Sequence, residues 1–291
     1  MALPDTETSS DRFAGMDAWD TPTLLAALWE GQLAAVAAVG AALPALVRAV
    51  EAAAERLRAG GRLAYTGAGT SGRIGVQDAV ELVPTFGWPE DRLVTRMAGG
   101  EAALLRSLED VEDQDADGVA AVAELGPADV LVGIAASGGT PFTLAAIQAA
   151  RRQGCLTIGV ANSVGTPLLA AAELAVLLET GAEVVAGSTR MKAGTAQKVA
   201  LNLFSTALMV RLGRVYRGQM VDMLPRNDKL RLRAERMLVR LAGCSAQEAR
   251  SALAGGGTVK VAMLVLRGMT REAAEAALAQ CGGDLRRALG E

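Results

Sequence analysis

The sequence predicts an α/β protein built on a doubly wound parallel sheet of five strands, with N-terminal helices and a small C-terminal three-helix module. From Arg62 onward, short apolar runs alternate with helical segments, and the expected strands lie at 62–66, 92–96, 129–135, 156–160 and 174–178. Two of these strands end in glycine- and hydroxyl-rich turns that open into helices. We expect an arm and helices over 1–54, a ligand-binding domain over 55–217, and a connector with the helical module over 218–291.

The N-terminal segment is predicted to be an arm followed by apolar helices. Residues 1–17 are polar and irregular, which is typical of a loose tail. Thr21 and Pro22 predict a helix start, with Thr21 as the N-cap residue and Pro22 in the first turn. Apolar residues at helical spacing continue from Leu24 to Leu57. Such helices pack on a partner subunit or, more simply, on the sheet of their own chain.

The first strand–turn–helix unit has the composition of a phosphate cradle. An apolar strand ends in Gly67-Ala68-Gly69-Thr70-Ser71-Gly72-Arg73, and a helix follows. Glycines let the backbone approach an anion, and the unpaired N–H groups and the dipole of the following helix favour negative charge there. Thr70 and Ser71 can donate hydroxyl hydrogen bonds to the same oxygens.

These glycines also match the G-x-G-x-x-G pattern of dinucleotide sites. Such a site requires an acidic residue about 20 positions further on to bind the ribose. The next strand instead ends in Arg96-Met97-Ala98-Gly99-Gly100, without an acid. An arginine could serve a phosphorylated ribose, so NADP stays a minor alternative.

A second unit repeats the arrangement. The strand run 129–135 leads into Ala136-Ser137-Gly138-Gly139-Thr140-Pro141, where Pro141 predicts the first turn of a helix that continues to Arg152. Two such units favour one small phosphorylated ligand held between two strand ends, and two ordinary tight turns are the alternative. Ser188 and Thr189 form a third hydroxyl-bearing helix start. They either contact the ligand or simply cap the helix that runs to about Leu212.

The C-terminal part is predicted to be a connector, a basic helix and a small helical module. The connector and basic helix cover residues 218–236. Within the module, Ser245-Ala246-Gln247-Glu248 has the capping-box pattern, helices are expected over Val259–Leu266 and Thr270–Gln280, and Gly282-Gly283-Asp284 opens a short last turn. We interpret the module as a packing or dimer-supporting element.

Composition excludes several classes of function. Of 291 residues, 51% are apolar but only 3% aromatic, so the core must be built from Ala, Leu and Val. A net charge of −3 argues against nucleic acid or an anionic membrane as the main partner. We find no basic stretch followed by an apolar signal core, and no uninterrupted apolar run of the roughly 20 residues that a membrane span needs. A cytoplasmic location is therefore expected.

The chain has no histidine and three scattered cysteines. The absence of histidine removes Ser-His-Asp chemistry, a histidine base and most zinc sites. Cys155, Cys244 and Cys281 lack paired metal-ligand spacing and are expected to be small core residues. Any acid–base chemistry would fall to carboxylates, lysine or tyrosine.

Glu81 and an acidic run are the carboxylates that could carry such chemistry. Glu81 lies among apolar residues near the end of the helix that begins at the first glycine turn, and Pro84 is expected to stop that helix. An apolar setting would keep its carboxyl protonated as an acid, and an exposed glutamate at a helix end is the alternative. The run Glu109, Asp110, Glu112, Asp113 and Asp115 is typical of a solvated face, and residue type alone singles out no catalytic member.

Together, these motifs resemble the N-acetylmuramic acid 6-phosphate etherase family, which is built on the sugar isomerase (SIS) domain. The resemblance covers about residues 50–235, and more loosely the C-terminus. It is carried by Gly67–Arg73, Glu81–Gly87, Ala98–Glu101, Gly133–Gly138 and Gly187–Lys198, of which the last run is the most specific. Two departures from the family pattern are Gly139, where we expect arginine, and the arm around Thr6-Glu7 and Arg12–Thr21.

The resemblance implies an enzyme that cleaves the D-lactyl ether of N-acetylmuramic acid 6-phosphate by elimination and then hydration. The products would be N-acetylglucosamine 6-phosphate and D-lactate, released in cell-wall recycling by a cytoplasmic homodimer without metal or cofactor. By position, Glu81 matches the family's proton donor and Glu112 its second active-site glutamate. Thr70, Ser71, Ser137 and Thr140 would hold the phosphate, with Ser188 and Thr189 nearby.

Two alternatives on the same fold stay open. One is an aldose–ketose sugar-phosphate isomerase, which shares ring opening and proton abstraction at C2 but needs no acid for a leaving group at C3. The other is a sugar-phosphate sensor without catalysis, similar to the glucokinase regulatory protein. The presence of both glutamates speaks against the sensor.

Overall fold

The computed structural model describes residues 4–108, 110–223, 225, 227–254 and 257–291. Glu109 of the acidic run and Leu224 and Arg226 of the connector lie outside these ranges. The chain forms two compact units. The first consists of Met1–Ala79 and Asp91–Ser205, and the second of Val80–Glu90 and Thr206–Glu291.

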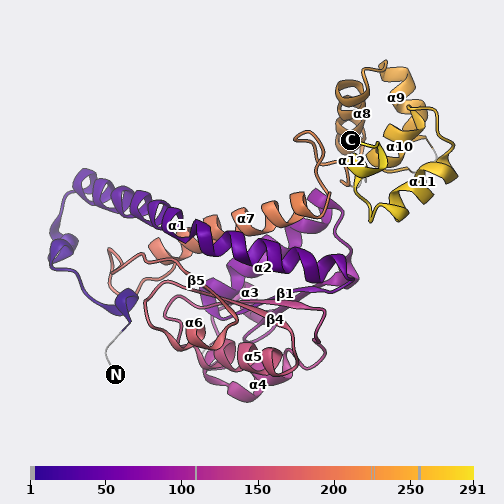
Figure 1. The fold of residues 1–291 in the computed structure, drawn as a ribbon. Helices are drawn as coiled ribbons and strands as arrows, with labels where there is room; N and C mark the ends of the chain where they lie inside the picture. The colour runs from indigo at the N-terminus through magenta and orange to yellow at the C-terminus, as the bar shows by residue number, and fades with distance from the viewer. Residues whose placement is uncertain (1–3, 109, 224, 226, 255–256) are drawn as a thin grey trace. The chain divides into compact units, whose positions relative to one another are not determined.

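The first unit is organised around one parallel sheet (Figure 1). Its strands are β1 (Leu63–Gly67), β2 (Leu93–Met97), β3 (Val130–Ile134), β4 (Leu156–Ala161) and β5 (Leu174–Leu177), each within one residue of its predicted range. The strand order is β2-β1-β3-β4-β5, and Gly67 pairs with both Met97 and Ile134. The carboxyl ends of β1 and β3 therefore lie side by side at the switch point, where doubly wound sheets bind ligands. The predicted fold class is confirmed.

Helices cover both faces of this sheet. On one face lie α1 (Thr21–Arg58) and the parts of α2 (Gly69–Phe86) and α7 (Lys192–Arg211) that belong to this unit (Figure 1). On the other lie α4 (Asp115–Ala120), α5 (Pro141–Arg152) and α6 (Pro167–Ala171), and the short α3 (Ala102–Leu105) follows β2 in the chain. Strands β1, β3 and β4 are buried throughout, as expected for strands covered on both sides.

Helix α1 differs from its prediction. Asp20, not Thr21, is the N-cap residue, because its carboxylate accepts the Thr23 N–H at 3.0 Å. The helix then continues through Pro44 as a single element. Its residues from Ala35 to Leu57 include a buried face that packs on β3, β4 and β5, and this packing outweighs the local cost of the proline.

Among the described residues, α1 is also the one helix long and apolar enough to cross a membrane. This finding rests on the length and composition of the helix alone. Of its most apolar 18-residue stretch, 33% is buried inside the chain. A helix that packs on a sheet in the core of a protein can have the same length and apolar composition.

From Pro4 onward the N-terminal arm has defined local structure and is not a loose tail. It forms short 3-10 turns at Asp5–Glu7, Asp11–Phe13 and Met16–Ala18. The Thr6 side chain is fully buried, and its N–H donates to Ser163 Oγ at 3.5 Å, just beyond β4. Thr6 is buried through a contact with a residue far away in the sequence, and the polar composition of the arm could not predict that contact.

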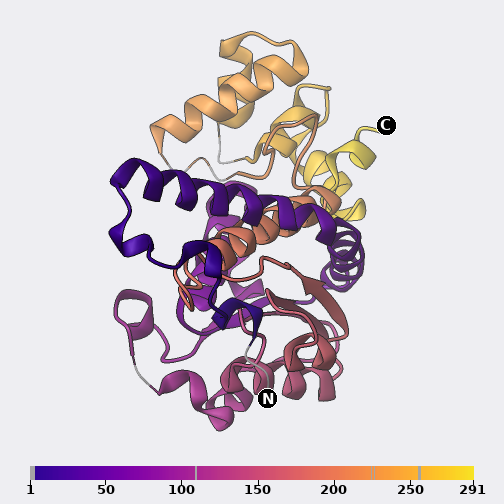
Figure 2. The same ribbon diagram turned by 90° about the vertical axis from the view of Figure 1, so that its left-hand side faces the viewer.

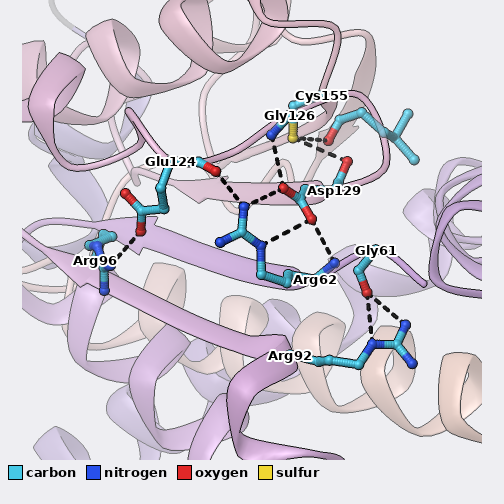
Figure 3. A network of polar contacts seen from close by, with 9 residues as sticks. Gly61, Arg62, Arg92, Arg96, Glu124, Gly126, Asp129 and Cys155 are labelled. Atoms are coloured by element: carbon cyan, nitrogen blue, oxygen red, sulfur yellow. Dashed lines mark hydrogen bonds and ion pairs between the residues drawn. The ribbon is translucent and has the colours of Figure 1, made fainter.

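A polar network fixes the amino ends of β1 and β3 (Figure 3). The Asp129 carboxylate accepts hydrogen bonds from the Arg62 N–H, Nε and Nη2 at 2.7–3.2 Å, and from the Gly126 N–H at 2.8 Å. Arg92 donates to the Gly61 carbonyl oxygen, directly before β1. This network lies at the opposite ends of the strands from the glycine turns.

The second unit contains the C-terminal helices, which are seen from another side in Figure 2. They are α8 (Asp228–Ala242), α9 (Ala246–Leu253), α10 (Val259–Val265), α11 (Arg271–Gln280) and α12 (Leu285–Ala288). The capping box is confirmed, since the Glu248 N–H donates to Ser245 Oγ at 3.2 Å and the Ser245 N–H donates to Glu248 Oε2 at 2.7 Å. Apolar side chains of α8–α12 and of the connector share one core.

The end of α2 also belongs to this unit. Pro84 does not stop the helix, which continues to Phe86. Gly87 then adopts a φ of 59°, and its N–H donates to the Val83 carbonyl oxygen at 3.0 Å. Leu82 and Trp88 are almost fully buried, and their burial holds this last turn in place.

Candidate active site

The first glycine turn brings the start of α2 directly against the end of β1. A Cβ at Gly67 would lie 2.9 Å from the Ile134 carbonyl oxygen, and one at Gly72 would lie 2.7 Å from the Gly67 carbonyl oxygen. Both positions therefore require glycine. Thr70 is half-buried and Ser71 is 7% exposed, both in the first turn of α2, where backbone N–H groups lack intrahelical partners.

The second turn follows the neighbouring strand. Gly138 adopts a φ of 64°, and a Cβ there would lie 2.3 Å from Thr166 Oγ1. Ser137 Oγ accepts the Gly139 N–H at 3.3 Å. Thr140 is the N-cap residue of α5, yet its side chain makes no capping hydrogen bond. Its hydroxyl thus has no structural role as a cap.

The third hydroxyl-bearing segment, which contains Ser188 and Thr189, lies beside the first glycine turn. A Cβ at Gly194, in the first turn of α7, would lie 3.4 Å from both Thr70 Cγ2 and the Thr189 carbonyl oxygen. Ser188 and Thr189 do not cap α7, which begins only at Lys192. The Glu183 carboxylate instead accepts the N–H groups of Lys192 and Ala193, each at 2.9 Å. Burial raises the pKa of Glu183, and these two hydrogen bonds partly offset that effect.

Glu112 and the first turn line one cavity. This cavity has a volume of about 410 Å³, within the range of small-molecule sites. Gly69 and Arg73 contribute from the turn, Met97 and Ala98 from the end of β2, and Glu112 from the acidic run. Arg73 donates to the carbonyl oxygens of Ala103 and Arg106, both at 3.0 Å, and so supports a segment that also lines this cavity.

The remaining predicted residues fall into two groups. Ser137, Thr140, Ser188 and Thr189 are half-buried in the first unit, and Glu112 is exposed at its cavity. Glu81 belongs to the second unit and its side chain is exposed, which agrees with the alternative of an exposed glutamate near a helix end. The described members of the acidic run are exposed, as expected for a solvated face.

Sequence reasoning missed a buried polar cluster on α2. Asp78 is 2% exposed, and its carboxylate accepts hydrogen bonds from the Tyr65 hydroxyl at 3.0 Å, Asn202 at 2.7 Å and Ser205 at 3.1 Å. Burial and the neighbouring Asp78 raise the pKa of Tyr65 well above its ordinary value. A lone acidic residue on the apolar face of α2 was the only available signal.

No group of three or more His, Cys, Asp or Glu side chains that could hold a metal ion occurs among the described residues. Cys155 is buried, which raises the pKa of its thiol to about 12, and Cys244 and Cys281 are half-buried. Cys244 packs against the core of the second unit.

The strand order, with hydroxyl-rich turns at the β1/β3 switch point, is that of a doubly wound ligand-binding fold, and two family models place this chain among the SIS-domain proteins. The family model of the glucokinase regulatory protein N-terminal SIS domain matches residues 45–151, and that of the SIS domain matches residues 108–207. A phosphoheptose isomerase from Francisella tularensis shares the fold, with a TM-score of 0.51 and 18% identity over 66% of this chain and 100% of the isomerase.

Relatives with much higher identity define the family. The N-acetylmuramic acid 6-phosphate etherase of Deinococcus radiodurans is 50% identical, covering 98% of this chain and 95% of that protein. The etherase of Symbiobacterium thermophilum is 52% identical over 79% of this chain and 77% of its own. The chain belongs to the N-acetylmuramic acid 6-phosphate etherase family.

Proposed function

We propose that this protein cleaves the D-lactyl ether of N-acetylmuramic acid 6-phosphate, giving N-acetylglucosamine 6-phosphate and D-lactate. One observation supports this proposal above the others. The cavity lined by Glu112 is also lined by Gly69 of the first glycine turn, so a carboxylate and an anion cradle share one space. In this proposal residues 55–217 bind the sugar phosphate, while 1–54 and 218–291 support that domain.

The phosphate would be held at the β1/β3 switch point. Thr70 and Ser71 offer hydroxyl and backbone donors at the start of α2, and Ser137 and Thr140 offer them before α5. Ser188 and Thr189 would lie close to the bound phosphate, because their turn is beside Thr70. A doubly charged phosphate ester does not cross a bilayer unaided, which fits a cytoplasmic location.

The chemistry needs one proton acceptor and one proton donor. The opened sugar carries an aldehyde at C1, which makes the proton on C2 acidic. A carboxylate takes that proton, the C2–C3 double bond forms, and the C3–oxygen bond to lactate breaks as an acid protonates the leaving oxygen. Water then adds to C3 of the unsaturated aldehyde. We assign the donor role to Glu81 and the acceptor role to Glu112.

Both glutamates would act on one substrate only in a dimer. Glu81 lies eleven positions beyond Thr70 on α2. Because a helix rises about 1.5 Å per residue, about 16 Å separates them along its axis. That is more than a hexose phosphate spans, so Glu81 would serve the site of a second copy. An exposed apolar stripe on α1 offers a surface for that copy, formed by Leu25, Trp29, Leu33, Val36, Leu43 and Val47.

The direct test is release of D-lactate from N-acetylmuramic acid 6-phosphate by the pure protein in EDTA. Glu81→Gln and Glu112→Gln should each lower kcat by about a hundredfold or more. Asp115→Asn, an exposed member of the same acidic run, is the matched control and should retain wild-type activity. Full activity of both glutamine variants would refute the assigned roles.

Mixing the two inactive variants tests the shared site. A random mixture of Glu81→Gln and Glu112→Gln dimers should regain about a quarter of wild-type activity, because each mixed dimer assembles one intact site. No recovery would mean that each chain uses its own two glutamates. An isomerase would instead give an isomeric sugar phosphate without lactate, and a sensor would bind the substrate without turnover.

A further inference from the structure

We propose that Arg214 is a positioning residue for Glu81, acting through a polar network that ties the end of α2 to the C-terminal helices. This inference rests on the proposed function, in which Glu81 is the proton donor. All residues of the network belong to the second unit.

The network begins at the last turn of α2. Arg214 Nη1 donates to the Gly87 carbonyl oxygen at 3.0 Å and lies 3.5 Å from that of Phe86. Carbonyl groups at the end of a helix lack intrahelical donors, and a cation is favourable there. The guanidinium also stacks over the Trp88 ring at 5.4 Å. Arg214 therefore satisfies and orients the end of the helix that carries Glu81.

Asp222 links Arg214 to the helical module. Its Oδ2 lies 3.4 Å from Arg214 Nη1 and also pairs with the Lys260 ammonium. Lys260 is 4% exposed on α10 and donates as well to the Gly283 carbonyl oxygen, before α12. A Cβ at Gly87 would lie 2.2 Å from the Asp222 carbonyl oxygen, so the connector runs directly against the end of α2.

This arrangement matters for Glu81 because its side chain makes no hydrogen bond within the described part of the chain. Its direction is thus set by the backbone of the last turns of α2. Those turns are held by the Trp88 N–H, which donates to the Leu82 carbonyl oxygen, and by the Arg214 contacts. A shift of about 1 Å in a reacting group is enough to lower a rate about a hundredfold. The C-terminal helices, through Arg214, would therefore set the catalytic rate without touching the substrate.

The test compares Arg214→Met with Arg217→Met. Arg217 is the matched control, because it also stacks on an aromatic ring and pairs with an acid, but those partners are Tyr216 and Glu291. We expect Arg214→Met to lower kcat for lactate release about 10- to 100-fold while KM stays within about twofold, since the phosphate-binding turns belong to the other unit. Arg217→Met should leave both constants within about twofold of wild type.

A double-mutant cycle separates positioning from general destabilisation. If Arg214 acts through Glu81, Arg214→Met should cause no further loss in the Glu81→Gln background. An equal loss in both backgrounds, or an unchanged kcat, would overturn the inference. Full activity of Glu81→Gln alone would instead refute the proposed role of Glu81. If Arg214→Met does not fold, Arg214→Lys, which keeps the charge but not the forked donor, allows the same cycle.

Discussion

The Arg62 guanidinium and the Asp129 carboxylate form an ion pair at the amino ends of β1 and β3, with Nη2 and Oδ2 2.7 Å apart. Burial raises the pKa of Asp129, but the hydrogen bonds from Arg62 and Gly126 outweigh it, and the pKa lies below its ordinary value of 3.8. The charged form of Asp129 therefore stabilises the folded sheet. That stabilisation is fully present above pH 3.8 and is lost as the pH falls through the lower folded-state pKa.

Asp129→Asn should therefore lower the free energy of unfolding by about 2 kcal/mol at pH 7. The difference from wild type should shrink as the pH is lowered below 3.8, because the wild-type carboxylate then becomes protonated as well. Urea unfolding at several pH values measures both effects. Glu124→Gln, which removes an exposed ion pair with Arg96, is the control and should cost less than about 0.5 kcal/mol. A deficit for Asp129→Asn that does not depend on pH would contradict this account.

The second glycine turn allows a comparison of adjacent residues. Gly138→Ala should destabilise the protein by about 2 kcal/mol or more, because φ is 64° and the new Cβ would lie 2.3 Å from Thr166 Oγ1. Gly139→Ala should be nearly neutral, since the nearest atom to its Cβ is Ser137 Oγ at 3.9 Å. Thermal unfolding of the two variants provides the measurement. Equal melting temperatures would show that the turn tolerates a side chain at Gly138.

Glu183, and not Ser188, accepts the first N–H groups of α7. Glu183→Ala should cost about 1–2 kcal/mol of unfolding free energy, because the N–H groups of Lys192 and Ala193 lose their acceptor. Ser188→Ala, at one of the two positions that the local sequence offers as a cap, should cost less than about 0.5 kcal/mol. Chemical denaturation of both variants measures the two losses of unfolding free energy and shows which residue stabilises the start of α7 more. A larger loss for Ser188→Ala would reverse the assignment.

Gly139→Arg tests the departure from the family pattern. Gly139 is exposed and its Cβ position is open, so an arginine should fold without strain. If the phosphate sits between the first two turns, the added guanidinium should lower KM severalfold at low salt, and the gain should shrink as salt increases. Gly139→Gln is the uncharged control. An unchanged KM at low salt would place the phosphate away from this turn.

Elements with a strong local signal were predictable from the sequence. The five strands were placed within one residue, because each is a short stretch rich in apolar residues between helical segments, and the three central strands β1, β3 and β4 are buried on both sides. The capping box at Ser245 and the proline at the start of α5 are also local, and both predictions are confirmed. The fold class follows from the alternation of these elements.

Features that depend on distant contacts were not predictable. Glu183 caps α7 from nine positions before the helix, where no local cap pattern would place it. Thr6 is buried against Ser163, which lies 157 positions away. The cavity shared by Gly69 and Glu112 likewise needs the fold to bring the acidic run to the first turn. Family resemblance, not residue type, singled out Glu112.

The division of the chain into interleaved units has a consequence for its synthesis. Residues Val80–Glu90 leave the ribosome before the 115 residues of Asp91–Ser205, and only after those do their partners in Thr206–Glu291 emerge. At cellular translation rates that delay is on the order of ten seconds. During it, Trp88 lacks Arg214, which stacks over its ring in the folded chain, and Leu82 and Phe86, which are buried there, belong to a unit that is still incomplete. A nascent chain that stalls before Thr206 would therefore present an aggregation-prone segment to chaperones.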